Sequence, residues 1–249
     1  MSHFKDHFSG VSDRYRRSRP TYPGALFSAM AGLAPGTGHA WDCATGNGQA
    51  AIGLAGHFDR VTATDASDQQ IAQAQAHPRI TYRTAPAEAS GLPDAVVDLI
   101  CVAQAVHWFD HAAFNAEAMR VLKPWGAMVW VAYQLTRVSP AVDEIIRPWY
   151  WGPLMDWWPE ERAHIDDGYE SLAFPFEPIE LPAFALSATW DVDAFLAYLN
   201  TWSGVTRMNA GTGGDVVAEI AGALRAAWGP DRRTVTWPLI IKAGRKSGA

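Results

Sequence analysis

The residues best suited to chemistry lie in one short stretch, Trp41-Asp42-Cys43-Ala44-Thr45-Gly46-Asn47-Gly48. Glycine accepts backbone conformations with positive φ and lets a ligand approach the main chain closely. A helix that begins after such a turn presents unpaired backbone N–H groups. Asp65 follows about 20 residues after the first glycine, where an acidic side chain accepts hydrogen bonds from ribose hydroxyls in nucleotide-binding folds. The stretch therefore predicts a turn that binds a nucleoside.

Asp42 distinguishes between the nucleosides that such a turn could bind. Gly46-x-Gly48-x-x-Ala51 also satisfies the dinucleotide pattern, which is weak evidence by itself. A carboxylate at the strand end would repel an anionic pyrophosphate, whereas it would attract a ligand with an amino group and a sulfonium. Asp42 therefore favours S-adenosylmethionine. The alternative is structural: Asp42 caps a helix or pairs with an arginine, and the glycines only form a turn.

Apolar segments that alternate with helix-like stretches must position this turn. The strand-like segments are nearly continuous in apolar residues, which is typical of strands covered on both faces. Helical crossovers between such strands produce a parallel, doubly wound α/β sheet. The predicted strands are residues 39–43, 60–65, 79–84, 96–103, 127–133, 184–190 and 234–242. The predicted helices are residues 21–34, 48–57, 67–77, 110–122, 191–203 and 215–228.

Composition narrows the class of protein. The 249 residues are 49% hydrophobic, which is enough to fold, and 18% charged with a net charge of −6. The acidic balance argues against a nucleic-acid partner, and the basic cluster Arg14, Arg16, Arg17 and Arg19 is better explained by a mobile lid or a docking point for an anionic substrate. No apolar run approaches the roughly 20 residues of a membrane span, and the first residues lack a signal-peptide pattern, so we expect a cytoplasmic protein.

Tryptophan is concentrated in one region. Residues 139–180 interrupt the alternation of strands and helices, and four of the 12 tryptophans fall in residues 149–158. We interpret residues 1–249 as one domain, with residues 1–36 as an N-terminal lid and helix and residues 139–180 as a cap inserted after the fifth strand. Aromatic side chains in the cap could wall a substrate pocket. A satellite core or a dimer interface is the alternative.

Several segments together resemble a known family. Asp42-x-Ala44-x-Gly46-x-Gly48 resembles the acidic-glycine motif of class I S-adenosylmethionine-dependent methyltransferases, with Ala44 in place of the usual first glycine. More segments are similar to the small-molecule branch, methyltransferase type 11, that includes trans-aconitate methyltransferase-like proteins. They are Arg19-Pro20-Thr21-Tyr22-Pro23, Pro86-Ala87-Glu88, Gln104-Ala105-Val106-His107-Trp108-Phe109-Asp110 and Thr201-Trp202-Ser203. The resemblance implies a Rossmann-like, mostly parallel seven-stranded sheet.

The resemblance also implies roles for individual residues. Asp42 and Gly46 would contact the methionine end of the cofactor, Asp65 the ribose, and Ala66 the adenine, while Tyr15 and Arg19 would belong to a closing N-terminal segment. The full set of expected cofactor contacts is Tyr15, Arg19, Asp42, Ala44, Thr45, Gly46, Gly48, Asp65, Ala66, Ala87, Glu88, Gln104 and Ala105. The expected substrate pocket is lined by His107, Trp108, Tyr133, Arg137, Trp149, Trp151, Trp202 and Arg207. No metal site is expected.

The chemistry depends on the acceptor. A carboxylate is anionic at neutral pH and attacks the sulfonium methyl as it stands, and Arg137 or Arg207 could orient it. Both could equally be solvated surface arginines. A hydroxyl or an amine must lose a proton, for which His107 is the candidate base or orienter. His107 could equally be a packed histidine beside Trp108.

We therefore predict an enzyme that transfers the methyl group of S-adenosylmethionine to a small-molecule acceptor, a carboxylate, hydroxyl or amine, by in-line displacement at the sulfonium methyl. A non-catalytic protein that binds an adenosyl ligand is the first alternative. A nicotinamide-dependent oxidoreductase is the second. The sequence predicts neither the acceptor nor the oligomeric state.

Overall fold

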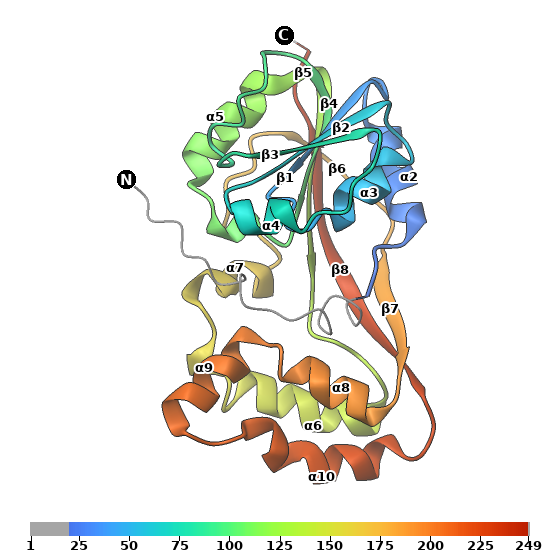
Figure 1. The fold of residues 1–249 in the computed structure, drawn as a ribbon, viewed down its shortest axis with the longest axis vertical. Coiled ribbons are helices and arrows are strands. Elements are labelled where there is room, and N and C mark those ends of the chain that lie inside the picture. Colours follow the sequence, from blue (N-terminus) through green and yellow to red (C-terminus); the bar gives the residue numbers. More distant parts are fainter. Residues whose placement is uncertain (1–19, 249) are drawn as a thin grey trace.

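A mixed sheet runs through the molecule (Figure 1). The computed structural model describes residues 20–248, and the strand order is β3-β2-β1-β4-β5-β8-β6, with β7 paired to β8. The first five strands pair in parallel, whereas β8 is antiparallel to its three neighbours. The strands are β1 (His39–Cys43), β2 (Arg60–Asp65), β3 (Ile80–Thr84), β4 (Val97–Ala103), β5 (Leu122–Tyr133), β6 (Glu177–Ile179), β7 (Ala185–Trp190) and β8 (Arg233–Arg245).

Helices cover both faces of the parallel part of the sheet. Alternate residues of β4 face opposite ways: Leu99 packs with the helices α2 (Gly24–Leu33) and α3 (Gln49–Ala55), and Ile100 packs on the side of α5 (His111–Val121). Two separate hydrophobic cores result, one on each face. The doubly wound α/β fold predicted from the continuous apolar strands is confirmed.

A second helical layer lies below the sheet (Figure 1). It packs around the lower half of β8 and β7 and has its own core, in which Trp228 and Trp237 are almost fully buried. Its helices are α6 (Pro140–Trp151), α8 (Val192–Leu199), α9 (Ser203–Thr212) and α10 (Val216–Trp228). The 3₁₀ turns η1 (Val106–Trp108), η2 (Met155–Trp157) and η3 (Glu160–Arg162), with the short helices α4 (Asp68–Ala72) and α7 (Ala163–Asp166), complete the described elements.

The structure differs from the predicted elements in four places. The helix predicted over residues 67–77 is only the five-residue α4. Within residues 139–180 the chain forms α6, despite its prolines, because Val142, Ile146 and Trp149 share one buried face. α9 is also absent from the prediction, and β6 adds a short eighth strand.

None of the helices within residues 20–248 combines the length and the apolar character that crossing a bilayer requires. Cys43 and Cys101 are buried and do not form a disulfide.

Candidate active site

The strand order creates a position for a ligand between β1 and β4. The chain runs from β1 outward through β2 to β3 and then returns to the other side of β1 as β4. In open α/β sheets, ligands bind outside the carboxyl ends of the strands at such a reversal. Ala44 after β1 and Gln104 after β4 both adopt positive φ, which is rare for residues other than glycine and clusters at functional sites. We call residues 42–48, Asp65 and Gln104 the ligand edge.

Asp65 connects two turns at the end of β2. Its Oδ2 accepts a hydrogen bond from the backbone N–H of Gly46 at 2.8 Å, and its Oδ1 accepts one from the N–H of Ser67 at 2.9 Å. Ser67 caps α4, and Ala66 between the two is exposed. A carboxylate has about four acceptor positions, so Asp65 can hold both turns and still accept from ribose hydroxyls.

Asp42 is fully buried beneath the glycine turn. Thr45 Oγ1 donates to its Oδ2, while Oδ1 makes no hydrogen bond of normal geometry with the described residues. Burial raises the pKa of Asp42 to about 7, against the opposing effect of the hydrogen bonds from Thr45 and the backbone of Ala51. A cation placed beside Asp42 would favour its ionised form.

Gln104 brings a second buried polar group to the ligand edge. Its backbone N–H donates to the carbonyl of Val131 at 2.8 Å, and its side-chain Nε2 is buried without a hydrogen-bond partner in the described chain. Unpaired buried donors and acceptors cost free energy. A ligand with an amino group for Asp42 and a carboxylate for Gln104 would pair both. The residues present therefore fit the methionine end of S-adenosylmethionine.

Both the backbone conformation at position 48 and the lack of room for a side chain there require glycine. Its φ is +91°, and a Cβ built on it would lie 2.3 Å from the hydroxyl oxygen of Tyr82 on β3. Any side chain at this position would displace Tyr82 or distort the turn that leads into α3.

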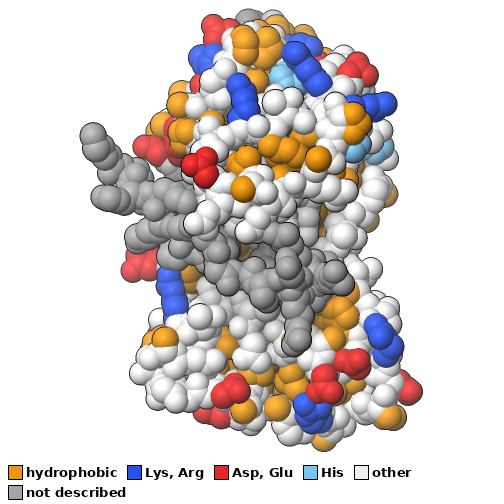
Figure 2. All heavy atoms as spheres, viewed as in Figure 1, with side chains coloured by type: hydrophobic (Ala, Val, Ile, Leu, Met, Phe, Trp, Pro, Cys, Tyr) orange, Lys and Arg blue, Asp and Glu red, His pale blue; other side chains and the backbone are white. Residues whose placement is uncertain are grey.

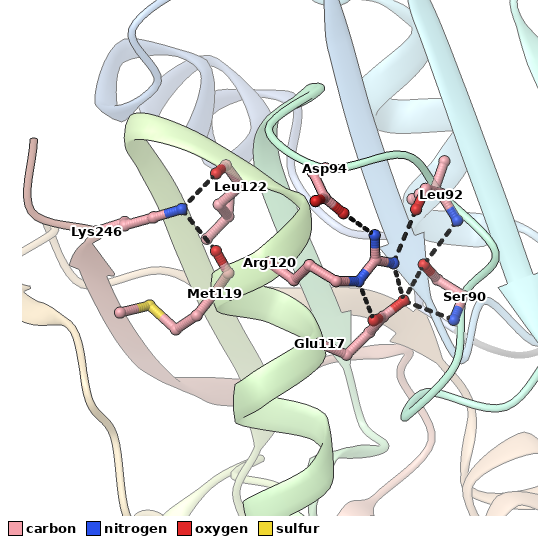
Figure 3. Close-up of polar contacts among 8 residues, drawn as sticks. All are labelled: Ser90, Leu92, Asp94, Glu117, Met119, Arg120, Leu122 and Lys246. Carbon is pink, nitrogen blue, oxygen red and sulfur yellow. Dashed lines mark hydrogen bonds and ion pairs between the residues drawn. The ribbon is translucent and has the colours of Figure 1, made fainter. Parts of the chain in front are cut away.

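A polar network fastens the loop after β3, residues 85–96, to α5 (Figure 3). Glu117 Oε1 accepts from the N–H of Ser90 at 2.8 Å and from its hydroxyl at 2.5 Å. Arg120 Nη2 donates to the same Oε1 and to the carbonyl of Leu92, both at 2.8 Å. Burial alone would raise the pKa of Glu117, but the hydrogen bonds from Arg120 and Ser90 lower it.

This anchored loop carries the residues expected to contact adenine. Ala87 is buried, and Glu88 Oε1 accepts from the backbone N–H of Asp110 at 3.0 Å, at the start of α5. One oxygen of Glu88 is thus engaged, and Oε2 makes no hydrogen bond within residues 20–248. Ala105, after β4, is buried beside the ligand edge.

His107 lies on η1, just beyond Gln104. It is 7% exposed, its Nδ1 is 3.2 Å from the hydroxyl of Tyr169, and its ring centroid is 4.8 Å from that of Trp108. Burial lowers the pKa of His107 to about 3, helped by the positive charge of Arg162. His107 is therefore neutral at physiological pH.

Arg162, which the sequence analysis does not single out, lies beside His107 on η3. Its Nε donates to the hydroxyl of Tyr150 at 2.6 Å, and its guanidinium carbon lies 4.5 Å from the ring centroid of Trp158. Arginine in an acidic loop carries no motif, so no sequence signal distinguishes it from a surface residue.

Aromatic side chains from three separated segments pack together beside Arg162, which lies over the rings of Tyr150 and Trp158. Trp202 lies at their centre, with ring centroids 6.1 Å from Trp149, 5.7 Å from Tyr150 and 5.7 Å from Trp158. The ring centroid of Tyr198 lies 5.8 Å from that of Trp202, with the two rings nearly perpendicular. We call these five rings the aromatic cluster.

The structure separates the expected substrate-pocket residues into groups. Trp149 and Trp202 lie in the aromatic cluster, and Tyr133 is partly buried against the lower core. Trp151 and Arg137 line a cavity of about 450 Å³ between the end of β5 and α6, whose lining also includes Asp166. Arg207 is exposed on α9 and forms no ion pair with the described residues. Tyr15 and Arg19 lie outside the described residues.

Comparisons with known proteins agree with this geometry. Residues 41–130 match the family model described as a methyltransferase domain. The chain is 31% identical over 229 residues to a Dictyostelium discoideum protein provisionally named a methyltransferase, with 90% of this chain and 87% of that protein covered.

Solved structures agree over about nine-tenths of the chain. A provisionally named type II methyltransferase from Anaeromyxobacter dehalogenans is 51% identical with a TM-score of 0.87, covering 91% of this chain and 97% of that one. A structure from Bacillus halodurans shares the fold at 19% identity and a TM-score of 0.54, covering 90% and 98% of the two chains. The ligand edge, the sheet order and these relatives together establish that the chain belongs to the class I S-adenosylmethionine-dependent methyltransferases.

Proposed function

We propose that the protein methylates a small molecule that binds between the ligand edge and the aromatic cluster. The observation that carries this proposal is the adjacency of two pairs of residues. Asp42 Oδ1 and Gln104 Nε2 are buried without a hydrogen-bond partner in the described chain, and His107 lies just beyond β4, next to the turn that carries Arg162. The first pair suits the methionine end of the cofactor. The second pair lies where an acceptor would approach the methyl group.

The bound cofactor supplies a methyl group already activated by its sulfonium. The chain then has to hold the cofactor, orient the acceptor in line with the methyl–sulfur bond, and exclude water. We assign the methionine end to the ligand edge and the ribose to Asp65. The adenine then lies between Ala66 and the loop that carries Ala87 and Glu88, and the network around Glu117 keeps that loop in place.

His107 acts as an orienter of the acceptor in this proposal. A base is most effective when its pKa lies near the working pH. A pKa of about 3 makes His107 a weak proton acceptor, whereas its neutral ring still forms hydrogen bonds. Tyr169 holds one ring nitrogen, and Nε2 is left for an acceptor.

The aromatic cluster excludes water from the methyl acceptor and shapes the pocket that the acceptor occupies.

Residues 1–249 form one methyltransferase domain in this proposal, with residues 139–180 as a cap and residues 1–36 as the N-terminal lid and helix. The face in Figure 2 supports a small molecule rather than a nucleic acid as acceptor, because its Lys and Arg side chains are scattered among acidic and apolar ones.

Two measurements test the proposal. Isothermal titration with S-adenosylmethionine, S-adenosylhomocysteine and NAD should show binding of the first two only. Deuterated-methyl S-adenosylmethionine, incubated with the protein and pools of organic acids, phenols and amines, should give a labelled product by mass spectrometry. Cofactor binding without transfer to any pool would favour the non-catalytic alternative, and preferential binding of NAD would overturn both.

A further inference from the structure

Arg162 is a partly buried cation that forms no direct ion pair with a described carboxylate. Its Nε is engaged by the Tyr150 hydroxyl, and neither Nη atom forms a hydrogen bond or an ion pair within residues 20–248. The hydroxyl of Tyr150 lies 3.3 Å from Asp166 Oδ1, so Tyr150 separates Arg162 from this acid. The arrangement fixes the orientation of the guanidinium, and Asp166 acts on it electrostatically without pairing directly with its Nη atoms.

The surroundings of Arg162 strengthen its attraction for an anion. Its guanidinium carbon lies over the ring of Trp158 at 4.5 Å and over that of Tyr150 at 5.5 Å. Aromatic rings on one side remove water and lower the local dielectric, so a charge–charge interaction there is stronger than at the surface.

The position of Arg162 connects it to the transfer site. The turn η3 that carries it packs on η1, which carries His107 directly after the ligand edge. Tyr133, the last residue of β5, lies near enough to act electrostatically on Arg162. Arg162 therefore lies close to the carboxyl ends of β4 and β5, where the acceptor must approach.

We propose that Arg162 binds a carboxylate of the methyl acceptor through its two Nη atoms, so that the natural acceptors are small organic acids. This inference rests on the proposed function above. Two parallel N–H donors match the geometry of one carboxylate. A single guanidinium with no second described cation at hand compensates one negative charge, which favours a carboxylate over a phosphate dianion.

Binding of simple acids tests the proposal without the natural acceptor. The probes are benzoate, phenylacetate and succinate, each against its amide, titrated into the whole protein with and without saturating S-adenosylhomocysteine. At least one acid should bind at least about 30-fold more tightly than its amide, because the amide leaves the guanidinium unpaired. Equal binding of acid and amide, or no binding by any acid, would overturn the proposal, as would inorganic phosphate that binds more tightly than the acids.

Substitutions assign the effect to Arg162. Arg162→Met should lower the affinity for the acid by at least about 30-fold. Arg162→Lys should lower it by about tenfold, because lysine keeps the charge but loses the paired donors. The matched control is Arg225→Met, which removes an exposed arginine of α10 that pairs with Asp193. Circular dichroism and the melting temperature establish that each variant is folded.

The cofactor serves as the second readout. S-adenosylhomocysteine should bind Arg162→Met as tightly as the unmodified protein. Acid binding unaffected by Arg162→Met would refute this inference and leave the proposed function standing. Failure of the unmodified protein to bind S-adenosylhomocysteine would instead refute the proposed function, while the acid titrations without it still test Arg162.

Discussion

The ligand edge and the aromatic cluster are built in opposite ways. The ligand edge relies on backbone N–H groups, glycines and carboxylates that lie within residues 42–104. The aromatic cluster relies on large rings from three segments, around a guanidinium held by Tyr150. Hydrogen bonds to the main chain need particular residues at particular spacings, whereas ring packing is satisfied by many combinations. The first region therefore carries a recognisable motif, and the second does not.

Loss of the Asp65 carboxylate, which we propose binds the ribose, should produce the largest change in cofactor affinity. Asp65→Ala removes the acceptor of the Gly46 and Ser67 N–H groups together with the proposed acceptor for the ribose, and charged hydrogen bonds contribute about 1.5–3 kcal/mol each. We expect S-adenosylmethionine affinity to fall at least about 100-fold by isothermal titration. Asp65→Asn keeps one acceptor oxygen, so its affinity for S-adenosylmethionine should fall less.

Asp59→Asn is the matched control, because Asp59 is exposed beside the opposite end of β2. The affinity of the Asp59→Asn protein for S-adenosylmethionine should equal that of the unmodified protein. Tight cofactor binding by a folded Asp65→Ala protein would show that the motif does not place the ribose.

His107→Ala should separate the two regions by kinetics. His107 lies beyond the ligand edge, so turnover with an acceptor identified by mass spectrometry should fall at least about 30-fold while S-adenosylmethionine affinity stays within about twofold. Because the pKa of His107 is about 3, the unmodified enzyme should show no loss of turnover from His107 protonation between about pH 6 and pH 8.

Tyr169→Phe removes only the hydroxyl beside Nδ1 and should cause a smaller loss than His107→Ala. Unchanged turnover in His107→Ala would remove His107 from the mechanism.

Asp42 should make cofactor binding depend on pH. In the folded protein the pKa of Asp42 is about 7, above the ordinary value of 3.8. The contribution of its neutral form to the free energy of unfolding is therefore fully present below about pH 4 and is lost as the pH rises through 7. A cationic ligand needs the ionised form. Affinity for S-adenosylmethionine should therefore rise about tenfold from about pH 6 to about pH 8.

Asp42→Asn should abolish this dependence and raise the melting temperature of the free protein at about pH 8, because it removes a buried charge. The same pH slope in both proteins would assign the titration to the ligand instead.

The adenine loop should give the smallest effect on cofactor binding. Glu117→Gln weakens the charged hydrogen bonds to Ser90 and Arg120, and we expect a loss of about 1–3 kcal/mol in the free energy of unfolding with only a few-fold loss of affinity. The pKa of Glu117 is lowered in the folded protein. Its contribution to the stability of the fold is therefore present at a pH above its ordinary pKa and is lost as the pH falls through its pKa in the folded protein.

Asp94→Asn removes only the exposed ion pair with Arg120 and should cost no more than about 1 kcal/mol. Denaturant titration measures both variants. Equal losses would mean that the buried part of the network does not hold the loop.

The order of elements from residue 39 to residue 133 could be predicted from the sequence, because buried parallel strands are continuous in apolar residues. α9 could not. Two of its glycines, Gly204 and Gly211, oppose a helix by propensity. A Cβ at Gly204 would meet the ring of Trp158 at 3.0 Å, and one at Gly211 would meet Trp157 at 2.3 Å. The glycines are there because the tryptophans pack against the helix.

Arg162 shows the same limit in the site. Arg137 and Arg207 attract attention because they follow a strand or a motif, yet Arg137 lines the cavity between the end of β5 and α6, and Arg207 is exposed. Nothing in the sequence around Arg162 states that Trp158 and Tyr150 will enclose it. Those contacts depend on the packing of η3 against η1 and α6.

The sequence by itself therefore determined the doubly wound sheet, the glycine turn and the carboxylates of the cofactor half, because hydrogen bonding and strand burial act over short stretches of chain. Only the tertiary structure decided which arginine lies next to the turn that carries His107 and which aromatic rings pack against it. Side-chain packing between distant segments depends on shape in three dimensions, and a linear pattern does not encode it.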